Sequence, residues 1–124
     1  MPSWKRPDDK PVVEFDPRIE ISPFTLYRRL REARGPLLVD VRSEPREWTL
    51  TGATRWPGEG WEPPNDRDVL LFDDDQREAM PVLQALREAG FERVRRLFGG
   101  MELYVFSLDA EVVGEETYLR RVGA

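Results

Sequence analysis

The 124-residue sequence contains neither cysteine nor histidine. Without cysteine there is no thiol nucleophile, no persulfide, no disulfide and no thiolate metal ligand. Without histidine there is no Ser-His or Cys-His catalytic pair. Lysine is also scarce, with two residues against 17 arginines. Any chemistry must therefore come from carboxylates, hydroxyls, arginines, the two lysines and backbone amides.

A basic surplus and long apolar runs are missing as well. The chain has 24 acidic and 19 basic residues, which gives a formal net charge of -5. This balance argues against non-specific binding to nucleic acid or to an anionic membrane surface, since both require a basic footprint. No segment approaches the roughly 20 apolar residues of a membrane span, and no apolar core of a secretory signal follows the first charges. We therefore expect a cytoplasmic protein that binds neither nucleic acid nor membrane.

The length fits one domain with its own hydrophobic core. Residues 1–17 are rich in Pro, Asp and Lys and are expected to form an extended arm. The domain proper is expected at residues 18–108, and residues 109–124 are expected to dock on it, with a last helix.

Helical and strand patterns alternate along the domain. We predict helices that begin at Ser22-Pro23 and over residues 43–50, 78–89 and 101–106, and short strands at 19–21, 37–39, 53–56, 69–72 and 94–97. A serine N-cap followed by proline is a good helix start, and the first helix is expected to bury Phe24, Tyr27, Leu30 and Ala33. Continuous apolar runs are typical of strands buried on both faces of a parallel sheet. The order predicts an α/β domain with a central, mainly parallel sheet flanked by helices.

Charged residues follow the two most apolar strands, at the edge where ligand sites of open α/β sheets lie. Asp40 and Arg42 follow the first of these strands, and Asp73, Asp74 and Asp75 follow the second. Three carboxylates could ligate Mg²⁺ or Ca²⁺, because hard cations prefer oxygen ligands. An acidic helix N-terminus, stabilised by capping and by the helix dipole, explains the same pattern without a metal. For Asp40 and Arg42, we favour a structural role, linking the strand to the next segment, over a role as a binding pair.

Three tryptophans, Trp48, Trp56 and Trp61, are expected near the mouth of this site. Aromatic side chains are enriched in recognition surfaces, although a short domain more often buries tryptophan in its core. Trp61, which follows Gly60, is expected to be the most exposed of the three. Together with Asp40 and Arg42, the tryptophans form the predicted binding rim.

Three segments, in order, resemble the rhodanese-like family. Residues 37–42 (LLVDVR) resemble its strand ending in Asp-Val-Arg, and Gly52-Ala53 with the later Pro57 resembles its Gly-Ala element. Residues 69–100 resemble its active-site strand, loop and helix and its closing Leu-x-Gly-Gly. The resemblance covers residues 19–106 and implies a rhodanese-like fold. It also implies that the former active-site loop consists of Asp73, Asp74, Asp75, Gln76, Arg77, Glu78 and Ala79.

The resemblance places Asp73 at the position of the family's catalytic cysteine. A carboxylate cannot take up a sulfane sulfur, and Glu78 and Ala79 stand where the family often has arginine and serine. Helix N-termini present amide donors and partial positive charge, which in the family hold an anionic sulfur. We predict that the Asp73 carboxylate satisfies these amides from within.

The expected function is therefore that of a catalytically inactive sulfurtransferase homologue without cofactor or metal. It would act as a protein-binding or regulatory module for an unknown protein partner. Two alternatives remain open at this point. One is a metal-dependent or carboxylate-based enzyme that uses Asp73, Asp74 and Asp75. The other is a sensor of an anion or small molecule that uses the former active-site loop.

Overall fold

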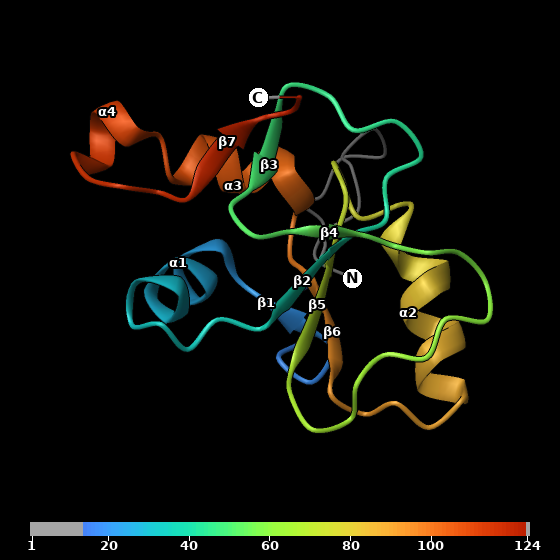
Figure 1. Cartoon of the computed structure of the whole chain (residues 1–124). Coiled ribbons are helices and arrows are strands. Elements are labelled where there is room, and N and C mark those ends of the chain that lie inside the picture. Colours follow the sequence, from blue (N-terminus) through green and yellow to red (C-terminus); the bar gives the residue numbers. More distant parts are fainter. Residues whose placement is uncertain (1–13, 124) are drawn as a thin grey trace, which may run out of the picture.

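A five-stranded parallel sheet forms the centre of the protein, as described by a computed structural model for residues 14–123 (Figure 1). The strand order is β1-β6-β5-β2-β4. The strands are β1 (Glu20–Ile21), β2 (Leu37–Asp40), β4 (Thr54–Arg55), β5 (Val69–Phe72) and β6 (Val94–Leu97). The fold class predicted from the sequence, an α/β domain with a mainly parallel sheet, is confirmed. The first 13 residues of the predicted arm lie outside the described residues.

The apolar run of β5 occupies the middle of the sheet. It pairs with β2 on one side and β6 on the other, and all four of its side chains are buried. Because successive strand residues point to opposite faces, the run feeds two hydrophobic clusters. Leu70 and Phe72 belong to one cluster, whereas Val69 and Leu71 belong to the other. A continuous apolar strand is required here because both faces of the sheet are covered by helices.

One face of the sheet carries α1 (Pro23–Arg31) and α3 (Gly100–Ser107), and the other carries α2 (Ala79–Glu88) (Figure 1). Helix α1 begins as predicted, because the Ser22 hydroxyl accepts a hydrogen bond from the Thr25 amide at 3.2 Å. Its predicted buried face is wrong in part, although Tyr27 and Leu30 do pack against the core. Leu26 is fully buried, whereas Phe24 is 61% exposed and Ala33 is exposed beyond the helix end. Both stripes obey helical spacing, and only the position of the sheet selects between them.

The predicted helix over residues 43–50 is also wrong. Residues 48–50 form β3 (Trp48–Leu50), which pairs antiparallel with β7 (Leu119–Arg121) from the end of the chain. The C-terminal segment therefore docks on the domain through a strand, after the single turn of α4 (Ala110–Val113), rather than through a last helix. Strand β7 lies about 70 residues from β3 in sequence, so no local sequence pattern predicts their pairing.

The connection from β4 to β5 contains no helix, in agreement with its predicted turn-rich character. Parallel strands are usually joined through a helix. Here the chain instead passes beside α2 as an irregular segment (Figure 1). Within residues 14–123, no helix combines the length and apolarity needed to cross a membrane.

Candidate functional site

The Asp73 carboxylate is turned into the loop that joins β5 to α2. One of its oxygens accepts a hydrogen bond from the Gln76 amide at 2.6 Å, and the other accepts from the Ala79 amide at 2.8 Å. The residue is only 1% exposed. The prediction that Asp73 satisfies loop and helix amides from within is therefore confirmed. The amides that could hold an external anion at this point already have a carboxylate.

The backbone of the same loop holds the start of α3. The carbonyl oxygens of Asp73 and Asp74 accept hydrogen bonds from the amides of Met101 and Glu102, at 2.6 and 3.0 Å. These amides belong to the first turn of α3, where backbone donors have no partner within the helix. Gly100 permits the close approach, because an added Cβ would lie 2.4 Å from the Asp74 carbonyl oxygen. The loop is thus held by hydrogen bonds both within itself and to α3.

Burial raises the pKa of the Asp73 carboxyl above its ordinary value. The hydrogen bonds from the amides of Ala79 and Gln76 act in the opposite direction, because they favour the charged form. Asp73 therefore binds its proton more readily in the folded protein than in the unfolded chain.

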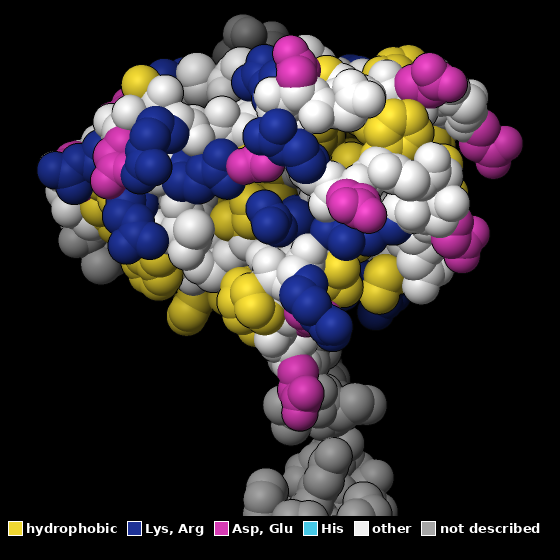
Figure 2. Space-filling view, turned by 90° about the horizontal axis from the view of Figure 1, so that it is seen from below, with side chains coloured by type: hydrophobic (Ala, Val, Ile, Leu, Met, Phe, Trp, Pro, Cys, Tyr) yellow, Lys and Arg dark blue, Asp and Glu magenta, His cyan; other side chains and the backbone are white. Residues whose placement is uncertain are grey.

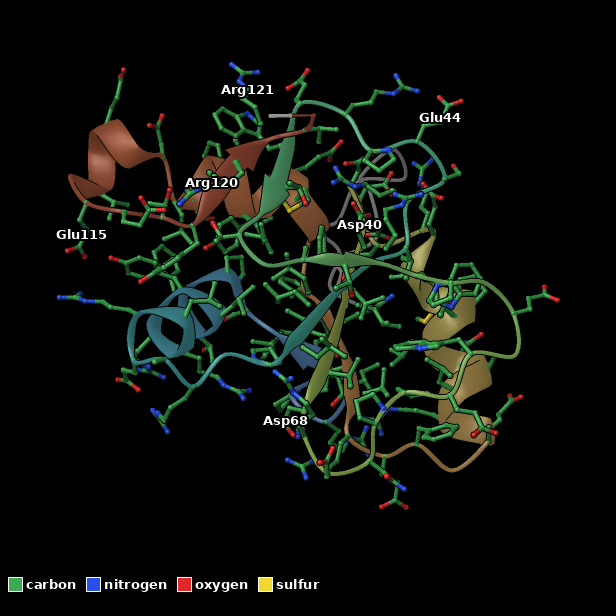
Figure 3. All side chains as sticks on the ribbon, in the orientation of Figure 1. Asp40, Glu44, Asp68, Glu115, Arg120 and Arg121 are labelled. Atoms are coloured by element: carbon green, nitrogen blue, oxygen red, sulfur yellow. The ribbon has the colours of Figure 1, made fainter. Side chains whose placement is uncertain are left out.

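Asp40 and Arg42 form a buried ion pair at the carboxyl end of β2, where Figure 3 labels Asp40. The Arg42 Nε and Nη2 donate to the two Asp40 oxygens at 3.0 and 2.9 Å, and Nη1 donates to Asp74 at 3.0 Å. A guanidinium fork matches a carboxylate in this bidentate geometry. The pair joins β2 to the loop after β5, which agrees with the structural interpretation of these two residues.

The three consecutive aspartates have three different partners. Asp73 accepts from amides, Asp74 pairs with Arg42, and Asp75 pairs with Arg77 at 3.2 Å. Among residues 14–123, no group of three or more acidic side chains comes together in a way that could hold a metal ion. The remaining loop residues, Gln76 and Glu78, direct a backbone amide to Asp73 and a carboxylate to the Ser43 amide, respectively.

The predicted binding rim is divided between two sides of the molecule. Trp56 and Trp61 pack against the α2-side cluster, but Trp48 packs against the other cluster with the Arg121 guanidinium 4.3 Å from its ring centroid. Asp40 and Arg42 lie buried between the two sides. All three tryptophans are half-buried, so Trp61 is not set apart by exposure. Sequence spacing could not show that β3, which carries Trp48, pairs with β7, whereas Trp56 and Trp61 lie on the other side of the central sheet.

Trp56 and Trp61 line a groove of about 600 Å³ beside α2. Pro81, Val82, Ala85 and Leu86 of α2 form its other wall. Sequence analysis did not select these four residues. The sequence feature that could have identified them is a second apolar stripe on α2, at positions i, i+1, i+4 and i+5, beside the stripe that faces the core.

The amino end of β5, which lies opposite the Asp73 loop, is surrounded by charged side chains of both signs. Figure 2 views the molecule from below, on the side where Figure 3 labels Asp68, and arginine side chains gather on this face. Arg29 and Arg93 both pair with Asp68, at 3.0 and 3.1 Å. These arginines are therefore partly engaged within the domain.

The fold and the loop define a small α/β protein in which a buried carboxylate occupies the turn between a central strand and the following helix. No protein-family model matches the sequence, and no curated protein matches it. Among solved structures, the chain is similar to the BH2092 protein of Bacillus halodurans, with a TM-score of 0.61 and 19% sequence identity. The match covers 73% of each chain. At this identity the likeness shows the fold alone.

Proposed function

We propose that this protein is a rhodanese-like domain without sulfur transfer that acts as a protein-binding module in the cytoplasm. One observation carries the proposal: the Asp73 carboxylate accepts hydrogen bonds from the Gln76 and Ala79 amides. The resemblance assigns this position to the family's cysteine. The chain has no thiol to carry sulfur. The half-buried Trp56 and Trp61 beside the loop supply a surface suited to recognition.

Loss of sulfur transfer is tested by restoring the thiol. We expect Asp73→Cys to give no robust thiosulfate sulfurtransferase activity, because Glu78 and Ala79 remain where the rhodanese-like family often has arginine and serine, and Glu78 keeps a negative charge at the loop. Asp73→Ser is the matched control for folding without a thiol. Robust turnover by Asp73→Cys would show that the loop retains a working anion site and would contradict the expectation that the rest of the loop no longer supports sulfur transfer.

A thermal-shift screen separates the proposed binding module from an enzyme or a sensor. Thiosulfate, phosphate and sulfate would be compared with Mg²⁺, Mn²⁺ and Ca²⁺ at matched ionic strength, and we expect no rise in Tm with any of them. A ligand at 100 times its Kd stabilises by about 2.7 kcal/mol, which is a shift of several degrees for a domain of this size. A rise with one divalent ion that is lost in Asp75→Asn would favour a metal enzyme. A rise with oxyanions would favour a sensor.

Binding itself is tested with a purified partner. Proteins captured by the full chain from extracts of its source organism would be purified and titrated against it by calorimetry. We expect at least one to bind in a defined stoichiometry, with lower affinity for Val82→Glu, which places a charge in the tryptophan-lined groove, than for Glu88→Gln elsewhere on α2. Capture without reproducible binding by the purified components would count against the proposal.

A further inference from the structure

The residues that line the groove beside α2 are spread along the helix. They are Glu78, which directly precedes α2, and Pro81, Val82, Ala85 and Leu86 of the helix itself. These residues recur at intervals of three and four and therefore lie along one side of the helix for about two turns. Eight helical residues rise by about 12 Å, which is the length of about four residues of extended chain. This length favours a peptide segment over a compact small molecule as the occupant.

The opposite wall comes from the irregular connection between β4 and β5. Trp56 and Trp61 pack against the α2-side cluster and also line the groove, so the core holds both indoles in place. Rigid aromatic side chains offer a large contact area at a small cost in conformational entropy. Gly58 and Gly60 lie between the two tryptophans and also line the groove, and an added Cβ at either glycine would meet no atom within 4 Å. No side chain therefore fills the groove from these two positions.

Only two of the residues that line the groove are charged, and both are acidic. They are Glu59 and Glu78. Neither forms an ion pair with a basic side chain of residues 14–123, although many arginines of this part of the chain do pair with carboxylates. The Glu78 carboxylate accepts the Ser43 amide at 2.8 Å, which fixes its position without neutralising its charge. The groove therefore combines apolar walls with two negative charges that no basic side chain of the described residues neutralises.

We propose that this groove binds a short segment of a partner protein in which a lysine or arginine lies beside apolar side chains. The apolar side chains contact Trp56, Trp61 and Val82, and the basic side chain pairs with Glu59 and Glu78. Complementary charge then sets the choice of partner and speeds association, while the tryptophan contacts supply most of the affinity. The inference rests on the proposed binding function and names its surface and the chemistry of its partner.

Designed peptides test the groove in the full chain. The probe is the capped hexapeptide Ac-Leu-Arg-Leu-Leu-Arg-Leu-NH2, and its control has glutamate in place of both arginines. Indole N–H resonances of the ¹⁵N-labelled protein report the binding site, with Trp48 on the far side as the internal control. We expect the basic peptide to shift Trp56 and Trp61 saturably, to leave Trp48 unchanged and to bind more weakly as salt is raised. The acidic peptide produces no saturable shift.

Charge variants make the expectation quantitative. Glu59→Gln and Glu78→Gln each weaken binding of the basic peptide about two- to fivefold, which is the range for a partly exposed ion pair. Glu88→Gln, which removes the same charge from α2 outside the groove, leaves the affinity unchanged. Equal binding of the acidic and basic peptides, or no saturable shift at Trp56 and Trp61, would overturn the inference. Self-association that disappears in Glu59→Gln would also overturn it, because the groove would then belong to a second copy of the chain.

The outcomes distinguish this inference from the proposed function. A purified partner that binds wild-type protein and the Glu59→Gln, Glu78→Gln and Val82→Glu variants equally well would overturn the groove assignment and leave the binding module intact. Divalent-ion dependence of a catalytic activity would contradict the proposed function itself.

Discussion

At the scale of single residues, one aspartate decides what the loop after β5 can do. Asp73 is buried, accepts two backbone amides and offers no sulfur chemistry. A cysteine thiolate at the same point would leave a reactive anion among the same donors. An aspartate at this point thus places an anion among the loop amides without a group that could carry sulfur.

The first prediction concerns the pH dependence contributed by Asp73. Its pKa is raised by burial, so its proton favours the folded state: the contribution is fully present below the unfolded pKa and is lost as the pH rises through the folded pKa. Between neutral pH and about pH 4, we therefore expect acidification to stabilise wild-type protein relative to Asp73→Asn. Urea unfolding of both proteins across this range measures the difference. A difference in free energy of unfolding between the two proteins that stays constant with pH would contradict the raised pKa of Asp73.

Asp68 serves as a control of opposite sign. Although burial raises the pKa of this carboxyl, the hydrogen bonds from Arg93 and Arg29 lower it overall. Its contribution to stability is present above the unfolded pKa and is lost as the pH falls through the folded pKa. Acidification should therefore destabilise wild-type protein relative to Asp68→Asn, in contrast to the result for Asp73.

The second prediction concerns the buried ion pair. Arg42→Met leaves the Asp40 carboxylate buried without its bidentate partner, and we expect a loss of about 3–5 kcal/mol in the free energy of unfolding. The double variant Asp40→Asn/Arg42→Met should lose less than the sum of the single variants, because it removes the uncompensated charge. Arg55→Met is the control, since Arg55 is half-exposed and lies 3.7 Å from Asp40. Additive losses in urea unfolding would show that the pair is not coupled.

At the scale of elements, the loop after β5 and α3 form one unit, and two glycines, Gly99 and Gly100, stand at the start of this helix. Gly99 and Gly100 both have positive φ, at 75° and 64°, and the chain then enters the helix whose first amides donate to the loop carbonyls. The two glycines of the Leu-x-Gly-Gly segment, residues 97–100, are thus needed where the loop after β5 packs closely against the start of α3. These two parts are separated in the chain by α2 and β6.

The third prediction tests this unit. Gly100→Ala should destabilise the protein by about 1–3 kcal/mol more than Gly90→Ala. Both glycines have positive φ, so both variants are strained, but only at position 100 would the new Cβ lie 2.4 Å from a backbone oxygen. At Gly90 it would meet no atom within 4 Å. Denaturant unfolding of both variants measures the difference, and equal losses would argue against the close contact between loop and helix.

At the scale of the whole molecule, stability is expected to be unequal across the two sheets. The central strand β5 is paired on both sides and fully buried, whereas β7 is paired only with β3 and exposes Arg120 and Arg121. The buried Tyr104 hydroxyl donates to the Thr117 carbonyl at 2.7 Å and holds the chain before β7.

The fourth prediction follows from this difference. In native-state hydrogen exchange, the amides of β5 should exchange only through global unfolding, and the amides of β7 should exchange through a local opening of lower free energy. Tyr104→Phe should lower the protection of β7 further while changing that of β5 by no more than the global loss. Equal protection of both strands would show that the C-terminal segment unfolds together with the central sheet.

Much of this architecture was predictable because it depends on local chemistry. The run Val69–Phe72 is apolar at every position, so it indicates a strand buried on both faces, and Ser22-Pro23 marks the start of α1 by capping. The role of Asp73 was predicted from the resemblance, which placed it in a loop that leads to a helix N-terminus, and its two amide donors do lie within six residues of it.

Other features depended on contacts between distant parts of the chain. Trp48 and Leu50 became part of β3 because residues 119–121 supply their backbone partners, and the same pairing separated Trp48 from the other two tryptophans. The choice of Leu26 over Phe24 for burial depended on where the sheet lies. The sequence by itself thus determined the alternation of elements, the absence of thiol chemistry and the bonding of Asp73 to nearby amides, because each depends on residue identity or on neighbours within a few residues. Only the tertiary structure decided which faces are buried and which side chains share the groove beside α2, because those depend on the packing of segments far apart in the chain.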